Sequence, residues 1–188
     1  MLEALIVIAI TMVMAALTAP SLMRTVTSIN VRYSARNLSG LMQTARIQAV
    51  RKNTFYSIQP MAMPGNVTGY YVDLNKNQTY ASGDTVVTMA SRATVTPGGG
   101  SGAPNETAFI ASLGFNVAAG SNPVTFNARG LPCIVAGSTC PQSAATGFVY
   151  FISTTGTFGQ ISWAAVAVTP SGHAQVWTCD SGGNWAQR

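Results

Sequence analysis

Charge is scarce in this chain, and acidic residues are the scarcest. The 188 residues include 10 Lys and Arg but only 5 Asp and Glu, so charged residues make up 8% of the chain. Soluble proteins usually contain about a quarter charged residues. His173 is the single histidine, and no two acids are spaced so that one helix or strand would hold both. Acid–base catalysis needs such positioned groups, so the sequence disfavours an enzyme.

Sites for cofactors and metals are equally poorly supported. Gly98–Gly102 is rich in glycine but lacks the lysine and the following helix of a phosphate-binding loop, so we expect no cofactor. Cys133, Cys140 and Cys179 could join His173 in a Cys₃His zinc site. Structural zinc sites favour two to four residues between paired cysteines, whereas six separate Cys133 from Cys140. We therefore expect no metal.

An uncharged apolar run from Ala4 to Met23 is the dominant feature of the sequence. A helix of about 20 residues spans roughly 30 Å, which is the thickness of the hydrocarbon core of a bilayer. A secretory signal would begin with cations, but the charge before this run is the acid Glu3. Pro20 predicts a local kink, which membrane helices tolerate. We expect residues 1–23 to form a hydrophobic transmembrane helix.

Glu3 needs a partner. The helix dipole favours a carboxylate at a helix N-terminus, but lipid penalises a carboxylate that no cation neutralises. The first cation along the chain is Arg24. The partner of Glu3 must therefore be the amino terminus of its own chain or a group on another copy of the protein.

The helical pattern continues as an amphipathic segment over residues 24–53, where Gly40 costs about 1 kcal/mol. Two apolar stripes lie about half a turn apart. We expect the later one to cover a β-sheet of the same chain, and the earlier one to face other subunits. The later stripe is Ser34, Leu38, Leu41, Met42, Ala45 and Ala49, and the earlier is Leu22, Val26, Ile29 and Tyr33. Six of the ten cations also lie in this segment, and we interpret them as a solvated helix face. They are Arg24, Arg32, Arg36, Arg46, Arg51 and Lys52.

Residues 54–188 have the pattern of a β-rich domain, because short β-branched or aromatic runs alternate with turn residues. Asn75–Asn77 and Ser82–Asp84 predict hairpin turns, and Pro97–Pro104 predicts a flexible loop. A long helix followed by an antiparallel sheet predicts the α+β class. The expected strands are Phe55–Gln59, Val67–Leu74, Thr85–Ala90, Phe109–Leu113, Val124–Asn127, Gly147–Ser153, Ile161–Thr169 and Ala174–Thr178.

Met1–Ile10, followed by Pro20, resembles the mature N-terminus of type IV pilins and type II secretion pseudopilins. The resemblance implies that a leader is removed, that the new N-terminal residue is methylated, and that Glu3 pairs with the amino terminus of a neighbouring subunit. Two residues precede Glu3 where the family usually has four. We expect either that two residues and the leader are missing from the sequence, or that the N-terminus is unusual.

Three later segments resemble the GspH/FimT type of minor pilins and pseudopilins. They are Asn37–Asn53 with its Ala-Arg-x-x-Ala-Val pattern, Val124–Pro132 with its Arg-Gly turn, and Val166–Gly172. The resemblance implies a type IV pilin-like fold and a structural subunit that polymerises through its N-terminal helix. The assembly residues that it implies are Glu3, Leu5, Ile6, Ile8 and Pro20.

The same resemblance implies partners and a location. The partners are copies of the chain or other pilins in a helical filament, together with assembly-platform machinery. The location is the bacterial inner membrane before assembly and a cell-surface filament afterwards. Two alternatives share these features: a pseudopilin of a type II secretion system, and a minor pilin that captures extracellular DNA during natural transformation.

DNA capture is the weaker alternative. DNA-binding members carry a terminal Gly-Arg-x-Arg-like motif whose cations neutralise phosphates. The matching stretch here is Gly172–Gln175, which contains no arginine. The candidate contacts are therefore Arg129, His173 and Arg188, and we expect DNA binding to be weak.

The exported setting favours a disulfide over a metal site. Cys133–Cys140 would close a short loop that contains Gly137, and it is our first choice. Cys140–Cys179 would tie this loop to the C-terminal strand, and it is the second choice. Either choice leaves one thiol free.

Overall fold

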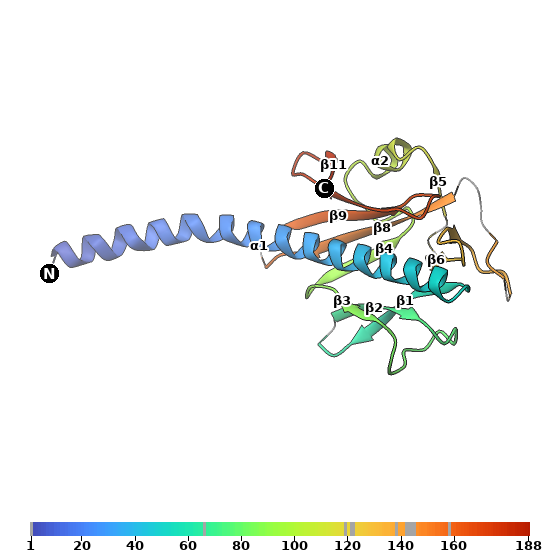
Figure 1. The fold of residues 1–188 in the computed structure, drawn as a ribbon. Coiled ribbons are helices and arrows are strands. Elements are labelled where there is room, and N and C mark those ends of the chain that lie inside the picture. The colour runs from blue at the N-terminus through green and yellow to red at the C-terminus, as the bar shows by residue number, and fades with distance from the viewer. Residues whose placement is uncertain are drawn as a thin grey trace.

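We describe a computed structural model of the chain over residues 2–65, 67–118, 120, 123–137, 139–141, 146–157 and 159–188. Side chains are described from residue 7 onward, except at residues 9 and 15–21. One long helix, α1 (Leu2–Arg51), is followed by β-strands and by a short helix, α2 (Glu106–Ser112). The predicted α+β class is confirmed, and Figure 1 shows α1 lying along the sheets with its first half projecting beyond them.

Among the described residues the strands form two sheets, where the sequence predicted one antiparallel sheet. The first sheet has the order β3-β2-β1-β6-β7. Its strands are β1 (Tyr56–Met63), β2 (Val67–Asp73), β3 (Val86–Thr88), β6 (Thr125–Phe126) and β7 (Pro132–Cys133). A slip of one residue would turn every buried side chain outward. The register of β1 on β2, in which Ile58 pairs with Val72, therefore keeps both of these buried residues in the core.

The second sheet has the order β11-β10-β9-β8-β4. Its strands are β4 (Ala93–Pro97), β8 (Thr146–Thr155), β9 (Ile161–Val168), β10 (Ala174–Cys179) and β11 (Trp185–Gln187). These strands pair antiparallel, whereas β5 (Asn116–Val117) pairs with β8 in parallel. Alternate residues of β8 and β9 are buried on opposite faces, so this sheet has a core on each side.

The main core lies between α1 and both sheets. Leu38, Met42, Ala45 and Ala49 are fully buried and Leu41 is 1% exposed, so the predicted sheet-facing stripe of α1 is confirmed. Tyr150 of β8 reaches across this core, where its hydroxyl accepts a hydrogen bond of 2.9 Å from the Val124 amide. The first and second sheets are therefore joined by a buried polar contact as well as by apolar packing.

The second core lies on the other face of β8, β9 and β10, under α2. Phe109 of α2 is 3% exposed and stacks on Trp185 with ring centroids 4.5 Å apart. The predicted strand Phe109–Leu113 is therefore wrong, because these residues belong to α2 and to its C-terminal cap. Ahead of α2, Glu106 accepts hydrogen bonds from Ser101 and Gly102, which fixes the start of the helix.

Two smaller predictions also need correction. The turns predicted at Asn75–Asn77 and Ser82–Asp84 do not close two separate hairpins, since both lie in one connection between β2 and β3. Asp73 and Asp84 are buried there and accept hydrogen bonds from backbone amides of the same connection. These hydrogen bonds to carboxylates take the place of the backbone hydrogen bonds between strands that a tighter hairpin would make.

Candidate functional site

The exposed face of α1 is the candidate functional site. The sheet-facing stripe fixes which way the helix is turned, and polar contacts reinforce this. The Ser34 hydroxyl accepts a hydrogen bond of 2.9 Å from the Ala90 amide, and the Asn37 side chain donates one of 3.2 Å to the Thr88 carbonyl. With α1 held in this rotation, the residues on its opposite side cannot reach either sheet.

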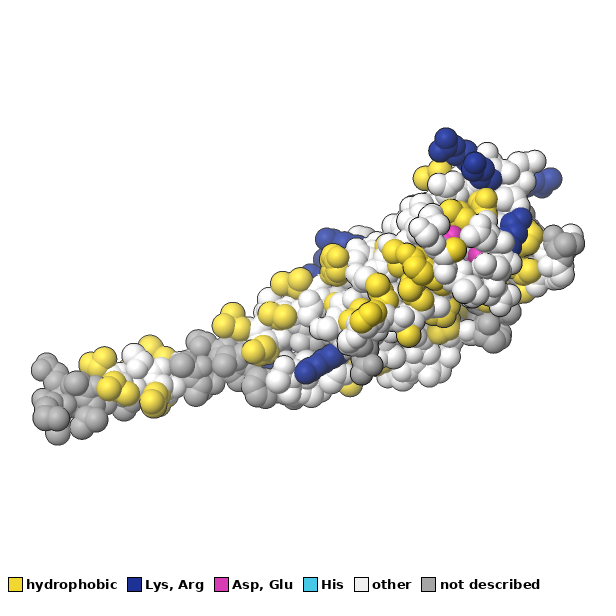
Figure 2. Space-filling model, turned by 90° about the horizontal axis from the view of Figure 1, so that it is seen from below, with side chains coloured by type: hydrophobic (Ala, Val, Ile, Leu, Met, Phe, Trp, Pro, Cys, Tyr) yellow, Lys and Arg dark blue, Asp and Glu magenta, His cyan; other side chains and the backbone are white. Residues whose placement is uncertain are grey.

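The second apolar stripe lies on that opposite side. Its members are exposed by half or more, although each is a large hydrophobic residue. Figure 2 shows hydrophobic side chains at intervals along the helix, including the part that extends beyond the sheets. The exposed fractions are 65% for Leu22, 51% for Val26, 58% for Ile29 and 54% for Tyr33. A row of this kind on a helix marks a surface that another molecule covers.

The predicted assembly residues near the N-terminus lie in α1. The side chains of Glu3, Leu5, Ile6 and Pro20 are outside the described residues, so the pairing of Glu3 remains a prediction. Ile8 is described and is 50% exposed. Over the residues that the structure describes, we find no helix with both the length and the apolar character of a membrane span.

The three candidate DNA contacts do not lie at one place. Arg129 and His173 are both exposed, and their loops touch, because Gly172 packs against the carbonyl of Gly130. Arg188 instead lines a hollow with Arg32 and Arg36 of α1. The sequence placed Arg32 and Arg36 on a solvated face but gave no signal that the last residue would join them.

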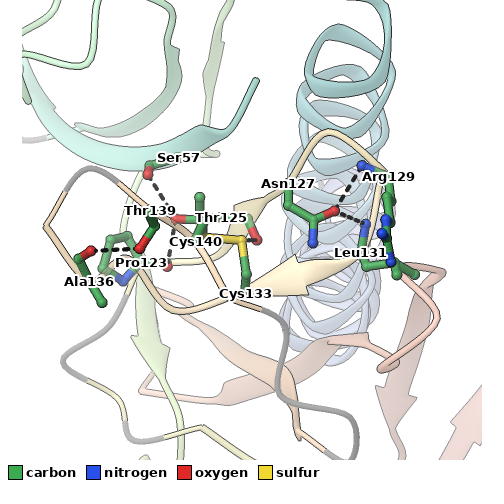
Figure 3. The surroundings of a disulfide bond; sticks show 10 residues. All are labelled: Ser57, Pro123, Thr125, Asn127, Arg129, Leu131, Cys133, Ala136, Thr139 and Cys140. Carbon is green, nitrogen blue, oxygen red and sulfur yellow. Dashed lines mark hydrogen bonds between the residues drawn. A yellow bond between two sulfur atoms is a disulfide. The ribbon is translucent and has the colours of Figure 1, made fainter. Parts of the chain in front are cut away.

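Cys133 and Cys140 form a disulfide with an S–S distance of 2.05 Å and Cα atoms 5.4 Å apart (Figure 3). Beside it, the Asn127 side chain accepts hydrogen bonds from the amides of Arg129 and Leu131 and shapes the turn before β7. Cys179 has a free thiol. Its pKa is raised mainly by burial and, to a smaller extent, by the nearby charge of Asp180. Within the described part of the chain, no three metal-binding side chains come together.

A family model described as type II transport protein GspH matches residues 34–172. This chain belongs to the GspH family. The match covers residues 34–51 of α1 and continues as far as the turn after β9, so it includes the sheet-facing stripe but not the exposed stripe. The family is one of structural pilins and pseudopilins rather than enzymes, as the resemblance implied.

A solved structure is also similar to this GspH-family chain. It is the type IV minor pilin FimU of Pseudomonas aeruginosa, with 16% sequence identity and a TM-score of 0.48. The similarity covers 83% of this chain and 92% of FimU. Among curated proteins, none matches this chain by sequence.

Proposed function

We propose that this chain is a structural subunit of a type IV pilus or a pilus-like filament and polymerises through its N-terminal hydrophobic helix. The observation that carries the proposal is the exposed stripe of Leu22, Val26, Ile29 and Tyr33. Burying apolar surface yields about 25 cal/mol per Å². Covering these side chains with helices of neighbouring subunits therefore gives assembly a driving force that folding leaves unused.

Two tyrosines provide a matched test of this surface. Tyr33 on the stripe is 54% exposed, and Tyr80 in the β2–β3 connection is 45% exposed. Tyr33→Ser should lower the number of surface filaments while the folded protein accumulates in the membrane, because only the assembled state buries this side chain. Tyr80→Ser should leave filaments unchanged. Equal filament counts in the two variants would remove the stripe from the assembly surface.

Glu3 is proposed as the group that sets the register of an incoming subunit. In a filament core of low dielectric, an unpaired carboxylate costs several kcal/mol. The protonated amino terminus of a neighbour is the natural counter-charge. Glu3→Ala and Glu3→Gln should both impair assembly and leave the globular part folded. Normal filament numbers with both variants, counted beside the membrane-held protein, would refute this role.

A second candidate is a pseudopilus subunit of a type II secretion system, and the description of the matching family model favours it. Before assembly the chain would be held in the bacterial inner membrane and handed to assembly-platform machinery in either case. Deleting the gene separates the two functions. Loss of surface filaments with normal protein secretion supports the pilus, whereas loss of secretion without loss of surface filaments supports the pseudopilus.

A further inference from the structure

A basic hollow lies between α1 and the C-terminal end of the second sheet. Arg32 and Arg36 come from successive turns of α1, and Arg188 follows β11. Together with Val176 and Thr178 of β10 they line a volume of about 250 Å³. Its polar lining is therefore three guanidinium groups and one hydroxyl, brought together from the two ends of the domain.

The third arginine is held in place by the sheet. The backbone amide of Arg188 donates a hydrogen bond of 2.9 Å to the Val176 carbonyl, and its Nε donates one of 3.3 Å to the Thr178 hydroxyl. Among the described residues, Arg32 and Arg36 have no side-chain hydrogen bond and no ion pair. Like charges that share a hollow repel one another, so an anion bound there would stabilise this arrangement.

Among the described side chains, no carboxylate lines this hollow, although Asp180 lines the adjoining one. Four of the chain's five acids are described, and each accepts hydrogen bonds from nearby amides of its own chain. Asp73 and Asp84 accept hydrogen bonds from amides of the β2–β3 connection. Glu106 accepts them from the loop before α2, and Asp180 accepts them from the turn between β10 and β11. Another copy of the chain would present the same occupied carboxylates. None of the four described acids is therefore placed as the counter-ion, which favours an anion from a different molecule.

We propose that this hollow binds the phosphate group of a small phosphomonoester. A carboxylate carries one charge and is matched by a single guanidinium. A phosphomonoester carries about −1.5 to −2 charges at neutral pH and offers three acceptor oxygens. Three guanidinium groups match that charge and that number of oxygens, and the planar fork of arginine suits bidentate contact with phosphate. This inference stands apart from the filament function, because it concerns the single folded chain.

The surroundings indicate where the rest of the ligand lies. An adjoining hollow of about 460 Å³ shares Arg32 and is also lined by Arg24, Ile161, Trp163 and the carboxylate of Asp180. A ring attached to the phosphate would pack on the half-buried Trp163. A nucleic acid carries one charge per phosphate and tracks along an extended groove. The three-arginine hollow is small, about 250 Å³, which favours a single dianion over such a polymer.

The test is binding of phenyl phosphate to the full-length chain in detergent micelles, measured by isothermal titration calorimetry. Phenylacetate is the matched probe, since it keeps the ring but carries a carboxylate. Phenyl phosphate should bind about tenfold or more tightly than phenylacetate. The single variants Arg36→Gln and Arg32→Gln should each lower the affinity for phenyl phosphate by about tenfold or more. Arg51→Gln, on the same helix but outside the hollow, should leave it unchanged.

Three results would overturn the proposal. Equal binding of the two probes would show that the dianion is not recognised, and equal binding by Arg36→Gln and the wild type would place the ligand elsewhere. The third concerns a short DNA duplex or vesicles of anionic lipid. If either bound through Arg36 and phenyl phosphate did not displace it, the hollow would belong to that polyanion. Circular dichroism of each variant excludes misfolding as the cause.

Discussion

The backbone amide of Ala90 donates a hydrogen bond of 2.9 Å to the hydroxyl of Ser34, which lies 56 residues earlier in the chain. Ser34 is fully buried in α1, and Ala90 lies between β3 and β4. This contact ties the helix to the segment that passes from the first sheet to the second. It also sets the rotation of α1 and, through it, the direction of the exposed stripe.

Ser34→Ala should therefore lower the free energy of unfolding by about 1–2 kcal/mol, because the Ala90 amide loses its acceptor. Ser39→Ala is the control, since the same exchange in the same helix changes intrinsic helix propensity equally. Urea denaturation of both variants measures the difference. If Ser34→Ala were as stable as the control, water or another acceptor would have to replace the hydroxyl.

Gly172 should tolerate no side chain. Its backbone has φ +81°, and a Cβ there would collide with the carbonyl oxygen of Gly130. Gly114 has a similar φ of +73° but open space around it. Gly172→Ala should cost about 1–3 kcal/mol more than Gly114→Ala, which isolates the effect of crowding from that of φ. Thermal unfolding of the two variants side by side gives the comparison, and equal losses would contradict the close packing.

Periodicity predicted the helix and its buried stripe because one face of α1 contacts the sheets over many turns. It failed at Phe109–Leu113, since a run of five residues is too short to separate a strand from a helix. The proximity of Arg32, Arg36 and Arg188 could not be predicted from the sequence, for another reason. It depends on where β11 is placed by the sheet, and no local pattern encodes a contact between the first and last parts of a chain.

The stability of the domain should fall at alkaline pH. Burial raises the pKa of Tyr150 to about 12, against 10.0 for an ordinary tyrosine, although the Val124 hydrogen bond lowers it slightly. Burial also raises the pKa of Tyr70. The unfolded chain releases these protons near pH 10 and the folded chain only at higher pH. The contribution of Tyr150 is therefore complete below pH 10 and is lost as the pH rises to about 12.

Tyr150→Phe tests this dependence. At neutral pH the variant should be less stable by about 1–3 kcal/mol, because the Val124 amide loses its acceptor. Between pH 10 and pH 12 its stability should fall less steeply than that of the wild type, by up to about 1.4 kcal/mol per pH unit. Tyr33→Phe, at an exposed position, should not change the stability at neutral pH. Parallel alkaline profiles of Tyr150→Phe and the wild type would refute the assignment.

The disulfide should contribute modestly, because Cys133 and Cys140 are only seven residues apart. Cross-linking so short a loop restricts the unfolded chain little, and the expected loss for the double Cys→Ala variant is about 2 kcal/mol. Urea denaturation with and without reductant checks this value. Peptide mapping of the oxidised wild type should recover the Cys133–Cys140 link, and a Cys140–Cys179 link would contradict it.

All three tryptophans of the chain, Trp163, Trp177 and Trp185, pack against the core under α2, and Trp163 also lines a hollow with Arg24 and Arg32 of α1. Intrinsic fluorescence is therefore mainly a reporter of the core under α2. Far-ultraviolet circular dichroism is dominated by the 50 residues of α1. The two optical signals read opposite faces of the second sheet. A mismatch between their unfolding curves would reveal an intermediate that has released one face and kept the other, without the introduction of a label.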